Sequence, residues 1–79
     1  MSMKRSEFLA LLDELFELPP GSLTGKESLA DLEGWGSMAM ISFMALVDEH
    51  FGMTLSPRQF APCVTVDDLV ALAGDKIAV

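Results

Sequence analysis

Prolines and glycines divide the sequence into a few runs, and within these runs the apolar residues recur at the three-and-four spacing of amphipathic helices. In the first run, five apolar residues fall on one face or beside it: Phe8, Leu9, Leu12, Leu15 and Phe16. This pattern predicts a helix over about residues 4–17. The helix should end before Pro19, because proline disfavours helical geometry in the preceding residue and cannot donate to the helical ladder.

A long loop and a second helix are predicted next. Residues 19–36 lack helical periodicity and are predicted as one loop, with a single turn near residues 27–31. Four apolar residues should anchor this loop: Leu23, Leu29, Leu32 and Trp35. Ser37 opens a helical run that continues to Phe51 without glycine or proline. Gly52 follows it as the expected left-handed cap residue.

The last part of the chain predicts one short and one longer helix. Pro57 is well suited to the first position of a short helix over about residues 57–61, and Pro62 ends it. Thr65 and Asp68 have the spacing of a capping box at the start of the final helix. Five apolar residues are expected to form its buried stripe: Val66, Leu69, Val70, Ala73 and Ile77.

These elements predict an all-α fold, because the sequence shows no alternating strand pattern and no internal repeat. The expected architecture is a small four-helix bundle of three main helices and one short third helix, with the long loop between the first two. With 79 residues, the chain should form a single domain over residues 1–79. A domain of this size has one modest core, so we expect no enzyme and no catalytic residue.

The charge of the chain restricts its partners. Twelve acidic against five basic residues give a net charge of −7, which repels phosphate backbones and argues against nucleic acid. Acidity of this kind steers a domain toward proteins with Lys/Arg patches, but it also simply keeps a small hydrophobic domain soluble. From charge alone, both interpretations stay open.

The cysteine content and the apolar runs of the sequence indicate the cellular compartment of the protein and whether it can bind a metal. Cys63 is the single cysteine, so neither an intrachain disulfide nor a cysteine-based metal site is expected. Asp67 and Asp68 lack the ligand spacing of a calcium loop, and we predict no metal site. A single cysteine suits the reducing cytoplasm. Acidic residues interrupt the apolar stretch behind the basic start of the chain, and no apolar run is long enough to span a bilayer, so we predict a cytoplasmic protein without membrane insertion. We expect a monomer, although Met38 and Ile41 leave weak self-association open.

The run that begins at Ser37 has two distinct faces. One stripe is suited to the core: Met40, Phe43, Met44, Val47 and Phe51. A neighbouring stripe carries a hydroxyl, small or apolar side chains and an acid: Ser37, Ile41, Ala45 and Asp48. This second stripe, followed by Glu49, is unusual for an ordinary solvated face and indicates a docking surface. A further hypothesis is that Met40, Met44 and Met53 help to shelter an apolar ligand, with ordinary core filling as the alternative.

Ser37 itself lies where a Gly-Trp-Gly loop enters a helix. The unpaired backbone amides and the partial positive charge of a helix start favour an anionic group attached there. The alternative is that Ser37 is an ordinary N-cap, a common role for serine at such a position. Position alone does not separate the two.

Three segments together resemble the acyl carrier protein family, over nearly the whole chain: Trp35-Gly36-Ser37-Met38, Val47-Asp48-Glu49-His50-Phe51-Gly52 and Thr65-Val66-Asp67-Asp68-Leu69. The resemblance implies that Ser37 accepts 4′-phosphopantetheine from coenzyme A through a phosphopantetheinyl transferase, in a cofactor site that includes Gly36 and Met38. The thiol of that arm would carry acyl groups as thioesters to synthases or ligases of fatty-acid, polyketide or related specialised biosynthesis. Such partners would have basic docking patches. The resemblance also maps partner recognition onto five residues: Met38, Ile41, Ala45, Asp48 and Glu49.

The chain departs from this family at two positions. Gly36 replaces the aspartate that the family has before its modified serine, which removes a carboxylate that the transferase is expected to use. A structural origin for this glycine, in backbone angles closed to other residues, and a diverged or engineered site are both open. Ser42 stands at a position that is acidic in many fatty-acid carriers. The docking face is therefore less negative and more apolar, which favours a specialised set of partners.

Other functions compete with an acyl carrier. A peptidyl or D-alanyl carrier would share the serine, the arm and the bundle, and an unmodified carrier-like scaffold would share the bundle alone. A serine hydrolase with Ser37, Asp48 and His50 is excluded by geometry. The 13 residues between Ser37 and His50 correspond to about 20 Å along one helix, with the two side chains on nearly opposite faces.

Overall fold

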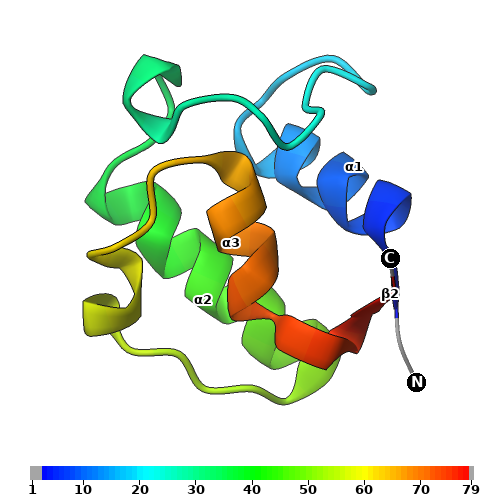
Figure 1. Cartoon of the computed structure of the whole chain (residues 1–79), viewed down its shortest axis with the longest axis vertical. Helices are drawn as coiled ribbons and strands as arrows, with labels where there is room; N and C mark the ends of the chain where they lie inside the picture. Colours follow the sequence, from blue (N-terminus) through cyan, green and yellow to red (C-terminus); the bar gives the residue numbers. More distant parts are fainter. Residues whose placement is uncertain (1–2, 79) are drawn as a thin grey trace.

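The computed structural model describes residues 3–78, and helices dominate it. The α-helices are α1 (Arg5–Leu15), α2 (Ser37–Phe51) and α3 (Val66–Leu72). Short 3-10 helices lie between or after them: η1 (Leu29–Asp31), η2 (Pro57–Phe60) and η3 (Gly74–Lys76). Figure 1 shows α1, α2 and α3 around a shared centre, with the long loop from α1 to α2 crossing the top of the view. The predicted small helical bundle is confirmed. No helix in this part of the chain is long and apolar enough to cross a membrane.

The end of α1 shows why this helix is shorter than the predicted residues 4–17. Glu17 adopts a left-handed conformation with φ of 58°, and the N–H of Leu18 donates to the carbonyl of Asp13 at 2.8 Å. The N–H of Glu17 donates to the carbonyl of Glu14 at 3.1 Å. These two bonds form a Schellman-type end, which satisfies the last carbonyls of the helix before Pro19 is reached. At the other end, Lys4 belongs to a strand.

The helix α2 has the predicted bounds and the predicted cap. Gly52 is left-handed with φ of 66°, and its N–H donates to the carbonyl of Asp48 at 2.8 Å. The predicted core stripe of this helix is only partly right. Phe43 and Val47 are buried as expected, but Met40, Met44 and Phe51 are half-buried, and Ala39 is buried in addition. The small Ala39 lets the first turn of α2 approach the rest of the core closely.

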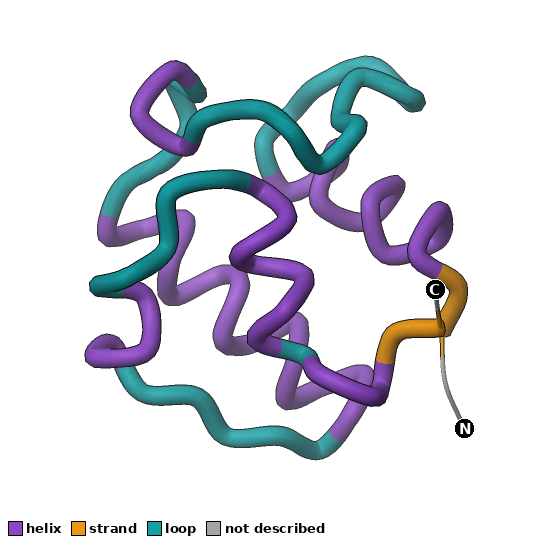
Figure 2. The backbone as a smooth tube through the Cα atoms, viewed as in Figure 1, coloured by secondary structure: helices purple, strands orange, loops and turns teal. Residues whose placement is uncertain are grey.

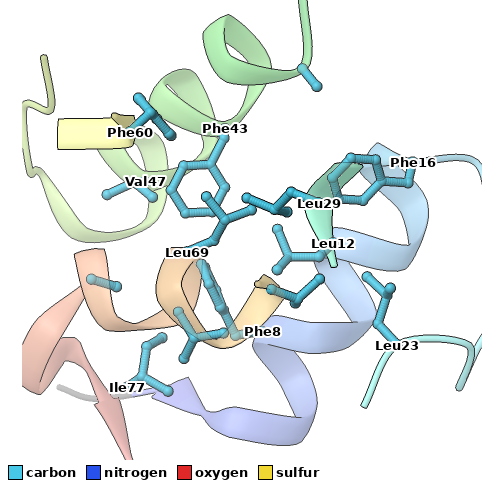
Figure 3. Close-up of a cluster of buried hydrophobic side chains, with 14 of the residues drawn as sticks. Phe8, Leu12, Phe16, Leu23, Leu29, Phe43, Val47, Phe60, Leu69 and Ile77 are labelled. Atoms are coloured by element: carbon cyan, nitrogen blue, oxygen red, sulfur yellow. The ribbon is translucent and has the colours of Figure 1, made fainter. Parts of the chain in front are cut away.

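The core lies between the three helices and is rich in aromatic rings. Phe8 from α1 packs edge-on against Phe43 from α2, and Phe43 packs edge-on against Phe60 from η2, with ring centroids 5.9 and 5.7 Å apart. Figure 3 shows Phe8, Leu12, Phe43 and Leu69 pointing toward one another from α1, α2 and α3. Edge-to-face pairs of this kind are stabilising beyond the area that they bury.

The C-terminal part of the fold differs from the prediction in three ways. The predicted short helix is present as the 3-10 helix η2 over Pro57–Phe60, one residue shorter than the expected residues 57–61. Ile77 is buried as predicted, but it lies beyond α3, because Gly74 with φ of 60° turns the chain. Ile77 then belongs to β2 (Ile77–Ala78), which pairs in parallel with β1 (Met3–Lys4) in the register Met3↔Ile77 and Lys4↔Ala78. Figure 2 shows the two strands side by side at the edge of the bundle.

The long loop is ordered by a buried carboxyl group. Asp13 of α1 is 2% exposed, and its two oxygens accept hydrogen bonds from the backbone N–H groups of Gly21 and Leu23 at 2.9 and 3.0 Å. Leu23 and Leu29 are buried, and Leu32 and Trp35 pack against the core from the half-buried positions expected of anchors. The predicted turn is present as η1.

The same loop is joined to the start of α3. The N–H of Asp67 donates to the carbonyl of Gly25 at 2.8 Å, and the N–H of Val66 donates to the carbonyl of Glu27 at 3.0 Å. Arg5 adds a salt bridge to Asp67 at 2.6 Å and a hydrogen bond to the carbonyl of Thr24 at 2.7 Å. The starts of α1 and α3 are therefore tied together through the loop.

The start of α3 has the predicted capping box. The N–H of Asp68 donates to the Thr65 hydroxyl at 3.3 Å, and the Asp68 carboxylate accepts from the N–H groups of Thr65 and Val64 at 3.0 and 2.8 Å. These hydrogen bonds lower the pKa of Asp68 below its usual value. The aspartate thus performs here the role that glutamate usually has.

Candidate functional site

Ser37 is the first residue of α2 and is exposed to solvent. The N-cap position belongs to Gly36, whose carbonyl accepts the first helical hydrogen bond from the N–H of Met40 at 3.0 Å. Within residues 3–78, no side chain caps this helix start. The alternative that Ser37 is an ordinary N-cap is therefore wrong. Its hydroxyl is not committed to holding the helix.

The first turn of α2 offers a favourable environment for a phosphate. The N–H groups of Ser37, Met38 and Ala39 precede the first helical hydrogen bond and carry the positive end of the helix dipole. A Cβ placed on Gly36 would meet nothing within 4 Å, so the space beside the serine is open. A phosphodiester on the Ser37 oxygen fits this site in both charge and room.

Gly36 has no conformational reason to be glycine. Its φ of 171° is extended backbone, which any residue adopts, and its surroundings leave room for a side chain. The structural origin considered for this residue, backbone angles closed to other residues, is therefore wrong. The absence of a carboxylate before Ser37 is a property of the sequence, and the fold does not require it.

Trp35 fixes the approach of the loop to Ser37. Its ring packs against Phe16 at the end of α1 and against Phe60 in η2, with centroids 6.2 and 6.0 Å apart. Its backbone N–H donates to the carbonyl of Leu32 at 3.1 Å. The aromatic contacts anchor the loop two residues before the serine, so that α2 starts at a defined place.

The residues proposed for partner recognition lie on the outward side of α2. Met38 is 78% exposed and Ile41 is 59% exposed, and Ala45, Asp48 and Glu49 are exposed as well. Met38 and Ile41 are three residues apart on the helix and are therefore neighbours on its surface, and adjacent exposed apolar side chains are typical of an interface. We call these five residues the α2 face. A third exposed apolar residue, Val64 at 63%, lies in the loop before α3 and was not singled out from the sequence, because a single valine in a loop has no periodic pattern.

A groove borders the α2 face on the side of the loop that follows α2. Ile41, Ala45 and Asp48 form one wall, and its volume is about 250 Å³. All three methionines pack against the core, and Met44 and Met53 also line this groove, whereas Met40 does not. Two of the three methionines considered for an apolar ligand therefore share one surface groove. Glu49 lies apart from it, on the side of α2 that faces α1.

The other reactive side chains do not form a catalytic group with Ser37. His50 is exposed in the last turn of α2, at the opposite end from the serine. Burial raises the pKa of the half-buried Cys63 thiol, and the nearby negative charge of Asp68 raises it further. A thiol with a raised pKa is mostly protonated and is a weak nucleophile at neutral pH.

Comparison with known proteins gives one match, to a family model. The model described as the phosphopantetheine attachment site matches residues 6–73, which includes α1 except its first residue, and all of α2 and α3. No curated protein and no solved structure matches the chain significantly.

Proposed function

The chain belongs to the family of phosphopantetheine attachment domains, and from this premise we propose that it is an acyl carrier protein modified on Ser37. Membership of the family makes it a carrier domain, for which covalent 4′-phosphopantetheine is the cofactor. Domains of this family generally carry substrates and do not themselves catalyse. The residue that is modified, the acyl group and the partners are the parts that we add.

The observation that carries the proposal is the state of the Ser37 hydroxyl. It is exposed, lies in the first turn of α2, and is not used as a helix cap. Serine at a helix start usually has the capping role, so an uncapped helix with a free serine beside it calls for another explanation. Attachment of an anionic group supplies that explanation, because the free amides of the first turn stabilise negative charge.

When attached, phosphopantetheine supplies a thiol on a flexible arm, on which an acyl group is held as a thioester. Ser37 would hold the group, and the amides of Met38 and Ala39 would favour its phosphate charge. Trp35, packed on Phe16 and Phe60, keeps the point of attachment fixed relative to the α2 face. The tethered acyl group then reaches each partner active site at a high effective concentration.

Two kinds of partner follow from the α2 face. A phosphopantetheinyl transferase would install the arm, and acyl-transferring synthases or ligases with basic patches would meet Asp48 and Glu49. Met38 and Ile41 would then fit apolar depressions on those enzymes. Because Ser42 adds no charge to this helix, the face favours enzymes of a specialised fatty-acid, polyketide or related pathway. We place this activity in the cytoplasm, on the basis of the single cysteine.

Intact-mass measurement tests the proposal. Incubation of the full chain with coenzyme A and a broad-specificity phosphopantetheinyl transferase should add one phosphopantetheine to the protein. The Ser37→Ala variant should show no addition. Ser42→Ala removes another exposed hydroxyl of the same helix and should be modified like the wild type. Addition to Ser37→Ala would overturn the assigned site, and no addition to the wild type would favour the unmodified scaffold.

A further inference from the structure

A second groove lies on the flank of α2 that faces α1. We call it the α1–α2 groove; it is formed by Leu11, Glu14 and Leu15 from α1 together with Ser42, Leu46 and Glu49 from α2. Its volume is about 450 Å³, larger than that of the groove beside Met44. Neither the family match nor the sequence pattern points to it, because the periodicity of residues 4–17 predicts only the buried face of one helix.

The groove exists because the two helices meet through large side chains on one side only. Phe8 of α1 packs against Phe43 and Phe51 of α2 with centroids 5.9 Å apart in both cases, and this contact holds the helices apart at the core. On the outer flank, Ser42 and Ala45 of α2 are too small to fill the resulting space. A depression remains that is open to solvent.

Four of the eight residues that line the α1–α2 groove are apolar, and three of these are leucines. Leu11, Leu15 and Leu46 line it and are half-buried. Each leucine therefore keeps some apolar area in contact with water. Covering that area with apolar surface of a partner is favourable, because it removes apolar surface from water.

The rim of the groove is negatively charged. Glu14 lies on the α1 side and Glu49 on the α2 side, and both are exposed. The lining, all of it within residues 3–78, includes no lysine or arginine; His50 at one end is its only basic-type side chain. Two carboxylates on opposite walls of an apolar depression complement a segment with a bulky apolar side chain flanked by cations.

We infer that the α1–α2 groove docks a basic amphipathic helix of a partner protein, so that partner recognition extends from the α2 face onto α1. The inference rests on the carrier function, since its occupant would be an enzyme that the carrier serves. Residues 42 to 50 of α2 span about 12 Å, which matches two turns of an occupying helix. Two turns present apolar residues at the spacing i, i+3, i+4 on one side and Lys or Arg beside them.

NMR titration of the unmodified, isotope-labelled chain with a synthetic helical peptide of leucine and lysine tests the inference. The largest backbone shifts should occur at Leu11, Leu15 and Leu46. A matched peptide with glutamate in place of lysine should not bind. Shifts confined to Met38, Ile41 and Asp48, or an absence of saturable shifts, would overturn the groove as the docking site.

Matched variants distinguish binding of the peptide in the groove from its general attraction to an acidic surface. Glu14→Gln should weaken binding of the lysine peptide about 3- to 10-fold, whereas Glu33→Gln, the same change at an exposed loop residue outside the groove, should leave it nearly unchanged. Ser42→Leu fills the groove without changing the charge and should weaken binding at least as much. Equal effects of Glu14→Gln and Glu33→Gln would contradict the inference.

The two proposals fail independently. Peptide titration uses the unmodified chain, so it does not depend on Ser37. Peptide binding lost while the Ser37 mass increase persists would refute the groove and leave the carrier function intact. A mass increase absent while the peptide still binds in the groove would refute modification and support an interaction scaffold.

Discussion

At position 36 the extended backbone leaves room for any side chain, and this distinguishes Gly36 from other glycines of the chain. Gly25 has φ of 108°, and a Cβ there would collide with Nη2 of Arg5 and Oδ1 of Asp67. A side chain at Gly25 would therefore disturb the contact that ties α1, the loop and α3 together. The fold therefore requires glycine at position 25 but not at position 36 of the same loop.

Gly36→Asp should fold as stably as the wild type, with a free energy of unfolding within about 0.5 kcal/mol. Gly25→Ala should lose about 1 to 3 kcal/mol, because it combines backbone strain with a steric clash. Urea denaturation followed by circular dichroism measures both. Equal destabilisation by the two substitutions would show that Gly36 has a structural role after all.

Among the helices and loops, the element most dependent on a single side chain is the first part of the long loop. The carboxyl group of Asp13 accepts from the N–H groups of Gly21 and Leu23, and the hydrogen bond to Leu23 is buried whereas Gly21 is exposed. Buried polar groups left without partners cost free energy comparable to several surface contacts.

Asp13→Ala should therefore destabilise the protein by about 1 to 3 kcal/mol, because it leaves the buried N–H of Leu23 without its acceptor and a small void behind, while water can replace the acceptor of the exposed Gly21. Glu14→Ala, an exposed acid next in the same helix, is the control and should change the free energy of unfolding by less than about 0.5 kcal/mol. Urea unfolding curves give both values. A small loss for Asp13→Ala would mean that water replaces the carboxylate without cost.

The elements that depend on nearby residues were predictable from the sequence. Periodicity gave the extent of α2, Gly52 its cap, and Thr65 with Asp68 the start of α3. The remaining features depend on partners that are distant in the chain. Asp13 finds its hydrogen-bond donors 8 and 10 residues away, and β1 pairs with β2 across the whole sequence. Two-residue strands and an acid within a helical run carry no periodic signal.

In the candidate site too, some features depend on nearby residues and others on residues that are distant in the chain. Ser37 and the stripe of Ile41, Ala45 and Asp48 follow from the spacing of residues along one helix, whereas the place of Met38 in the α2 face and the role of Ser37 come from the family resemblance. Whether Ser37 caps the helix depends on the conformation of Gly36, which the sequence left open. The α1–α2 groove requires two helices to be placed side by side, so no single run of residues predicts it.

Over the whole molecule, acid stability depends on carboxylates that hold backbone N–H groups. Burial by itself would raise the pKa of Glu27, but hydrogen bonds from the N–H groups of Thr24 and Gly25 and from the Thr24 hydroxyl outweigh this and lower it to about 2. The ordinary value is 4.5, so the charged form is favoured by folding. Glu27 and Asp68 therefore stabilise the junction between the loop and α3 only while they are ionised.

The free energy of unfolding should thus fall as the pH is lowered from about 4.5 toward 2, where Glu27 is protonated in the folded chain. Above pH 4.5 the stabilisation by Glu27 is fully present. Urea titrations at several pH values measure the slope, which should be shallower for Glu27→Gln and unchanged for Glu33→Gln. An unchanged slope for Glu27→Gln would contradict the assignment.

The aromatic contact before Ser37 also has a spectroscopic consequence. Trp35 is the only tryptophan of the chain, and its ring rests on Phe16 and Phe60 two residues before Ser37. Indole emission shifts in wavelength when the polarity around the ring changes. The fluorescence of the native protein should therefore report changes at the end of the bundle where the acyl group would be loaded, in real time and without an added dye.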